Sequence, residues 1–170
     1  MIAIALFAAG LGVAAQSTAK PPQLPPCDTR TEARQFDFWL GEWDVTANGK
    51  PAGVNRIEKI LSGCVLQENW TGAGGSQGKS WNWYDIGDNK WHQLWLSSNG
   101  APMLKLSGGF SGNVMRFEGT SIGPGGVTLQ NRLQFFKLEG DRIRQFWEQS
   151  RDGGKTWTTT FDGEYRRRAG

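Results

Sequence analysis

The sequence predicts an all-β fold, an antiparallel up-and-down barrel of eight to ten strands preceded by a short helical turn. Two observations carry this prediction. Short β-type segments follow one another from Trp43 to the C-terminus, separated by turns rich in Gly, Asn and Asp. No stretch has the period of a long amphipathic helix, so no helical crossover separates the strands. A long meander removes its exposed edges by closing into a barrel.

The turns that bound the strands have suitable local chemistry, as in Asn48-Gly49, Asn99-Gly100 and Glu139-Gly140-Asp141. Residues 33–40 form the predicted helical turn, which Gly41 ends. A barrel of this size is wide enough to hold one small ligand. The expected strands cover residues 43–47, 54–61, 64–71, 79–85, 90–97, 102–109, 113–121, 126–138, 142–149 and 156–166.

The N-terminal end has the pattern of an export signal. Residues 2–15 are apolar or small and carry no charge, and the run is shorter than the ~20 residues that cross a bilayer. It ends in a small-x-small cleavage site. We therefore predict a signal peptide over 1–15, a Pro-rich linker over 16–28 and a single β-barrel domain over 29–170. The predicted location is periplasmic or extracellular, without a stable membrane anchor.

Export bears on the two cysteines, Cys27 and Cys64. An even number of cysteines in an oxidising compartment predicts a disulfide between them. Two free, buried thiols are the alternative, because spacing does not prove connectivity.

Charge and ligand chemistry exclude several classes of partner. The net charge is +3, but both signs are scattered and the one basic run is Arg166–Arg168. Binding nucleic acid requires a clustered basic surface, so a solvated tail is expected and no nucleic-acid partner. One His and two paired Cys cannot supply a three- or four-ligand metal site of N and S donors. His92 is the one candidate haem ligand, and it lies on the strand face opposite Trp91; we expect no metal and no cofactor.

The segment "SRDGGKTW" (150–157) fits the pattern S-x-D-x-G-x-T-W and resembles the Asp-box turn of sialidases. A propeller carries one such box per blade, whereas this chain holds a single copy and is too short for several blades. We therefore interpret the segment as a structural hairpin. Asp152 would accept the hydrogen bonds of the turn, and Trp157 would pack on the following strand.

Four motifs carry a resemblance to known proteins: "FDFWLGEWDV" (36–45), "GCVLQENWTG" (63–72), "YDIGDNKWHQLW" (84–95) and "RQFWEQSRDGGKTW" (144–157). In this order they resemble an uncharacterised family of secreted bacterial proteins with an F-D-F-W-x-G-x-W motif. Gly41-Glu42-Trp43 also looks like the G-x-W signature of lipocalins and other calycins. The resemblance implies a calycin-like barrel whose Trp43 packs across the closed end, and it implies no activity.

Strand parity selects the residues of a candidate ligand site, because alternate side chains of a strand point to opposite faces. Several strands place a Trp or Tyr on the same face as an amide or a charge, which is what a ligand cavity requires. Glu68 and Arg132 are expected to face each other inside the barrel and to anchor the polar part of a ligand. The candidate ligand-binding residues are Glu68, Trp70, Tyr84, Trp91, Gln93, Trp95, Arg132, Gln134, Gln145 and Trp147.

The leading interpretation is a secreted, monomeric or weakly dimeric barrel that binds a small, partly apolar molecule. Two alternatives stay open: an enzyme such as a cyclase, isomerase or hydrolase that uses Glu68 or Tyr84 as acid or base, and a glycan-binding or structural module with exposed Trp. The nine Trp could also fill a solid barrel or line its outside.

Overall fold

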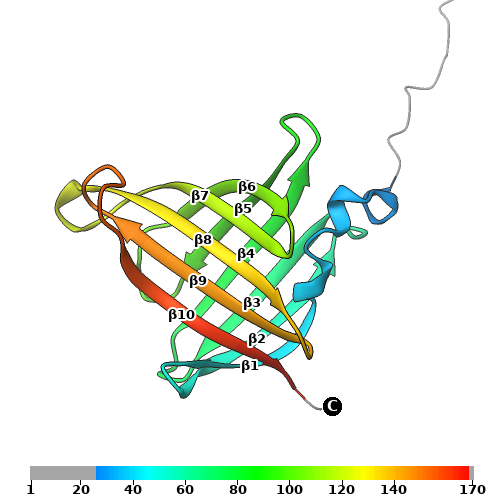
Figure 1. Ribbon diagram of the computed structural model, residues 1–170, viewed down its shortest axis with the longest axis horizontal. Helices are drawn as coiled ribbons and strands as arrows, with labels where there is room; N and C mark the ends of the chain where they lie inside the picture. Colours follow the sequence, from blue (N-terminus) through cyan, green and yellow to red (C-terminus); the bar gives the residue numbers. More distant parts are fainter. Residues whose placement is uncertain (1–25, 169–170) are drawn as a thin grey trace, which may run out of the picture.

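The computed structural model describes residues 26–168, in which ten strands close into one antiparallel barrel (Figure 1). Each strand pairs with its neighbours in sequence, and β1 closes the barrel against β10. The predicted up-and-down barrel is therefore confirmed. The strands are β1 (Gly41–Ala47), β2 (Lys50–Ile60), β3 (Val65–Gly72), β4 (Gln77–Asp85), β5 (Lys90–Ser97), β6 (Leu104–Ser111), β7 (Val114–Ile122), β8 (Thr128–Leu138), β9 (Arg142–Ser150) and β10 (Thr158–Arg167).

Each predicted segment corresponds to one strand, and the largest difference is the start of β2. That strand begins at Lys50, directly after Asn48 and Gly49, which both have positive φ. Two consecutive residues in this conformation form the tight hairpin turn whose twist matches that of the strands. The pairing of Ala47 with Lys50 follows from that turn.

Three short 3₁₀ turns precede the barrel: η1 (Cys27–Thr29), η2 (Glu32–Arg34) and η3 (Asp37–Trp39). A further turn, η4 (Pro124–Gly126), lies between β7 and β8. Figure 1 shows the N-terminal turns, in blue, at one end of the barrel. We call this the closed end, because Phe36 and Trp39 are fully buried there, stacked with ring centroids 4.8 Å apart.

The closed end is a solid aromatic cluster. The Phe36 ring also contacts the rings of Trp91, Phe117 and Phe135, at centroid distances of 5.8, 5.9 and 5.1 Å. Trp43 of the G-x-W segment is buried beside them and donates a hydrogen bond from Nε1 to the Trp39 carbonyl oxygen, at 2.8 Å. The segment before β1 therefore packs into the barrel as part of its core.

The Cys27–Cys64 disulfide is present and joins η1 to the turn between β2 and β3. It ties the N-terminal segment to the barrel wall, as the even cysteine count predicted.

The predicted signal peptide and most of the predicted linker lie outside the described residues. Within residues 26–168, no helix has the length and apolar character needed to cross a membrane.

Candidate functional site

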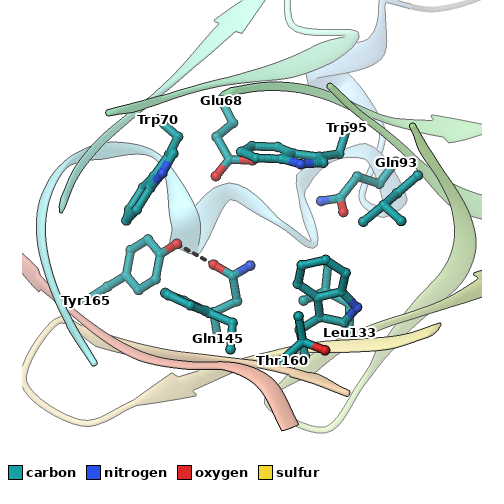
Figure 2. Close-up of a pocket in the computed structure, with 11 residues that line it drawn as sticks. Glu68, Trp70, Gln93, Trp95, Leu133, Gln145, Thr160 and Tyr165 are labelled. Atoms are coloured by element: carbon teal, nitrogen blue, oxygen red, sulfur yellow. Dashed lines mark hydrogen bonds between the residues drawn. The ribbon is translucent and has the colours of Figure 1, made fainter. Parts of the chain in front are cut away.

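The half of the barrel away from the closed end holds a cavity of about 200 Å³ (Figure 2). Strand β5 runs from the filled end of the barrel to the cavity. Trp91 packs against Phe36 at the closed end, whereas Gln93 and Trp95, farther along the strand, face the cavity. The lining residues come from six strands. They are Glu68, Trp70, Gln93, Trp95, Leu104, Leu133, Gln145, Trp147, Thr160, Phe161 and Tyr165.

Six of the ten residues predicted from strand parity are in this lining. They come from three strands whose inward faces were inferred correctly, and the structure brings them around one space. These six are Glu68 and Trp70 of β3, Gln93 and Trp95 of β5, and Gln145 and Trp147 of β9.

Trp91 and Tyr84 also point inward, but they lie at the closed end and do not reach the cavity. Trp91 is fully buried and donates a hydrogen bond from Nε1 to Gln35 Oε1, at 3.1 Å. Tyr84 packs edge-on against Trp91, and its hydroxyl donates to Asn89 Oδ1 at 3.4 Å. Neither is part of the cavity that the parity argument expected them to line.

The predicted placement of Arg132 and Gln134 inside the barrel is wrong. Leu133 of β8 is buried and pairs with Phe117 of β7 and Trp147 of β9, so its two neighbours in sequence point outward. Arg132 donates from Nε to Glu148 Oε2 at 2.6 Å, on the outer wall. Its guanidinium also lies 4.1 Å from the centre of the Trp157 ring. Glu68 and Arg132 therefore do not form the predicted interior pair.

Glu68 is the one acidic group of the lining. The residue is only 5% exposed, and its carboxylate accepts hydrogen bonds from Asn55 Nδ2 at 2.7 Å and from Ser80 Oγ at 2.6 Å. Among the described residues that line the cavity there is no Lys, Arg or His. Desolvation raises the pKa of Glu68 from 4.5 to about 7, although the two hydrogen bonds lower it.

A chain of buried amides continues from Glu68 along the wall. Asn82 donates from Nδ2 to Ser80 Oγ at 2.8 Å, and Gln93 donates from Nε2 to Asn82 Oδ1 at 2.7 Å. The Gln93 amide nitrogen is thereby held toward the wall. Its Oε1 has no hydrogen-bond partner within residues 26–168 and is available to a ligand.

A second hydrogen bond orients the opposite side of the cavity, where the Tyr165 hydroxyl donates to Gln145 Oε1 (Figure 2). Burial, followed by the nearby Glu68 charge, raises the pKa of Tyr165 well above 10, so the hydroxyl keeps its proton. Because Oε1 of Gln145 is occupied, its amide N–H groups are the donors left for a ligand.

Aromatic rings form most of the remaining walls, and glycines make room for two of these rings. A Cβ atom at Gly53 would overlap the Trp70 ring, and one at Gly78 would overlap the Trp95 ring. The Trp70 and Trp95 rings therefore occupy the space beside glycines of the neighbouring strands β2 and β4. We call Trp70, Trp95, Trp147 and Phe161 the aromatic cage; Trp70 and Phe161 meet edge to face at 6.3 Å.

Five lining residues were not predicted: Leu104, Leu133, Thr160, Phe161 and Tyr165. For Leu133 a signal was present in the sequence. The three-residue turn 139–141 pairs Leu138 with Arg142, and counting back along both strands pairs Leu133 with Trp147. Phe161 could not be found by counting, because a register shift between Thr159 and Phe161 changes which residues of β10 face inward.

The Asp-box segment is a structural turn, as expected. The Asp152 carboxylate accepts hydrogen bonds from Ser150 Oγ, from the backbone N–H groups of Lys155 and Thr156, and from Thr156 Oγ1. Led by the bond from Thr156 Oγ1, these interactions lower the pKa of Asp152 to about 2. The Arg132 guanidinium of β8 lies over the Trp157 ring, a contact that was not predicted.

Asp85, Asp88 and His92, in the β4–β5 hairpin, place potential metal-ligand atoms within 4.8 Å of one another. The cluster is on the outer surface, and two of its carboxylates already accept backbone hydrogen bonds, from Gly87 and Lys90. His92 stacks on Trp83 with ring centroids 5.3 Å apart. These contacts account for the cluster as part of a turn, and we assign no metal to it.

No protein-family model matches the chain, and no curated protein has significant sequence similarity to it.

Proposed function

We propose that this barrel binds one small, partly apolar molecule in its open half. The observation that carries the proposal is the cavity itself, which combines the aromatic cage with a buried carboxyl and two oriented amides. Apolar walls with a few convergent polar groups are typical of ligand pockets. The volume of about 200 Å³ is below the ~300 Å³ at which pockets for drug-sized compounds begin, so the ligand is a small metabolite-sized compound.

Native mass spectrometry of protein isolated from its own cells tests this proposal. A small molecule should co-purify in one copy per chain and be lost on unfolding. Trp70→Leu, which removes one wall of the cavity, should abolish the co-purification. Trp83→Leu, on the outer face of the next strand, is the matched control and should retain it. Equal retention by both variants would contradict binding in this cavity.

Catalysis is the second candidate, favoured by the protonation behaviour of Glu68. A carboxyl with a pKa of about 7 is suited to both accept and donate a proton near neutral pH. Tyr84, the other acid or base considered, does not line the cavity. If the co-purifying compound is turned over, the rate should depend on a group with an apparent pKa near 7, and Glu68→Gln should remove that dependence.

Glycan binding by exposed Trp has weaker support. Trp81 and Trp83 do lie on the outer wall of β4, but His92 already covers one face of the Trp83 ring.

We further propose that the protein acts outside the reducing cytoplasm and belongs with the calycin-like barrels. The disulfide supports the first proposal, because structural disulfides persist in oxidising compartments. The ten-stranded meander with Trp43 at the closed end is consistent with the second. N-terminal sequencing of protein from the periplasmic or secreted fraction tests the export, because the mature chain should begin after Ala15.

A further inference from the structure

We infer that the ligand is a small organic cation, a quaternary ammonium or protonated amine, held with its charge between the aromatic cage and Glu68. The inference rests on the proposed binding function and adds the chemical class of the ligand. Figure 2 shows the Glu68 carboxyl between Trp70 and Trp95, with Tyr165 and Gln145 across the cavity.

The first observation is the composition of the walls. Three Trp, one Phe and one Tyr surround a space of about 200 Å³. The face of an aromatic ring carries negative partial charge, and several rings around one space attract a cation strongly, Trp most of all. An apolar molecule would fill such walls equally well, so the walls alone do not choose the charge of the ligand.

The second observation is the charge of the groups that line the cavity, which favours a positively charged ligand. Glu68 is buried at the cavity, and Arg132, its cationic partner predicted from the sequence, is on the outer wall. The described residues that line the cavity include no positive side chain. A buried carboxylate without a counter-charge is costly, and a bound cation supplies the charge that the protein lacks. An anionic ligand could accept hydrogen bonds from Gln145, but the Glu68 carboxylate and the negative faces of the rings would repel it.

The third observation is the hydrogen bonding left to a ligand. An ionised carboxylate offers about four lone-pair positions, of which Asn55 and Ser80 use two. Gln145 presents N–H donors toward the cavity, because its oxygen is held by Tyr165. A cation that also carries a hydroxyl, ether or carbonyl oxygen would satisfy both groups.

Binding measurements with three probes test the inference: choline, tetramethylammonium and 3,3-dimethyl-1-butanol, the neutral carbon analogue of choline. Titration followed by tryptophan fluorescence and by calorimetry at pH 8 should give choline at least tenfold tighter binding than its neutral analogue. Tetramethylammonium should bind, and more weakly than choline. Equal or tighter binding of the neutral analogue, or no binding of either cation at 100-fold excess over protein, would overturn the inference.

Two pairs of variants assign the effect to the named groups. Glu68→Gln should weaken choline binding at least tenfold and leave the neutral analogue unchanged. Glu148→Gln, an acid on the outer wall, should change neither. Trp95→Leu should weaken choline binding, and Trp81→Leu, on the outer face of β4, should not. Circular dichroism establishes that each variant is folded, and loss of binding in a folded outer-wall control would count against the site.

The pH dependence gives an independent readout with choline, whose charge does not titrate. Affinity should be full above pH 7 and fall as the pH drops below it, because Glu68 then takes up a proton. The other titratable group of the lining is Tyr165, which stays protonated throughout this range. A flat profile between pH 5 and 8 would overturn the role of Glu68. If both cations fail while a neutral compound co-purifies, the cation inference fails and the proposed binding function stands.

Discussion

The two halves of the barrel use the same kind of side chain to opposite effect. At the closed end, Phe36 and Trp39 enter the barrel from the preceding segment and fill it together with Trp91 and Phe135. In the open half no such segment enters within the described chain, and the Trp70 and Trp95 rings lie over Gly53 and Gly78 of the neighbouring strands. Aromatic content therefore does not distinguish a core from a binding site. What distinguishes them is whether a further element occupies the centre.

The polar groups follow the same division. Glu68 and Gln93, the two ends of the hydrogen-bonded chain that runs through Ser80 and Asn82, line the cavity.

Removing the ring at the centre of the closed-end aromatic cluster should have the largest effect on the free energy of unfolding. Phe36→Ala should lower the free energy of unfolding by about 3–5 kcal/mol, since it leaves a cavity among fully buried rings. Phe161→Ala, the same change in the half-buried cage, should cost much less because a space already exists there. Chemical denaturation measures both. Equal losses would show that the two halves are packed alike.

Opening the disulfide should weaken the attachment of the closed-end segment. The bridge spans 37 residues, for which the chain-entropy model gives a stabilisation of about 3–4 kcal/mol. The double variant Cys27→Ser, Cys64→Ser should show this loss in denaturant and expose the closed-end tryptophans to quenchers. An unchanged midpoint would mean that ring packing alone holds the segment in place.

Stability without ligand should depend on pH through Glu68. Folded protein keeps the Glu68 proton up to about pH 7, whereas a glutamate with the ordinary pKa of 4.5 loses it earlier. Folded protein therefore binds more protons between these values, and its free energy of unfolding falls as the pH rises through this range. The pKa difference corresponds to a loss of roughly 3 kcal/mol.

Glu68→Gln should remove this component of the pH dependence. Glu148→Gln is its outer-wall control and should keep it. Denaturation series between pH 4.5 and 8 would contradict the assignment if the Glu68 variant retained the full slope.

The smallest effect is expected at the Asp-box hairpin, which is exposed. Asp152→Ala removes the acceptor of four hydrogen bonds within the turn and should lower the melting temperature by a few degrees at most. Ligand binding should be unchanged, because Asp152 is not part of the lining. Because its pKa is depressed, this stabilisation is present above pH 3.8 and is lost as the pH falls through about 2. A selective loss of binding would make Asp152 functional.

Most of the fold could be predicted from the sequence, because turn residues and strand alternation act locally. Turns such as Asn48-Gly49 impose their geometry through one or two residues, and the alternation in β5 separates Trp91, Gln93 and Trp95 from His92. Six lining residues were predicted for the same reason, because the inward faces of β3, β5 and β9 were identified correctly.

The inward face of β8 was predicted wrongly, because both faces of this strand mix apolar and polar residues. Arg132 and Gln134 share a face with Phe136, while Leu133 and Phe135 share the other with Asn131. Composition could not choose between them. The choice is made by register, which places Leu133 between Phe117 and Trp147 and gives Arg132 the outer-wall carboxylate of Glu148.

The sequence by itself determined the meander, the cysteine pair and the residue types available to a ligand, since turn chemistry and strand alternation act over a few residues. Only the tertiary structure decided which aromatic residues fill the barrel and which surround a cavity. It also decided that, within residues 26–168, no cationic side chain lines the cavity beside Glu68. Those outcomes depend on strand register around a closed barrel and on the entry of residues 36–39 at one end, contacts between residues far apart in the chain.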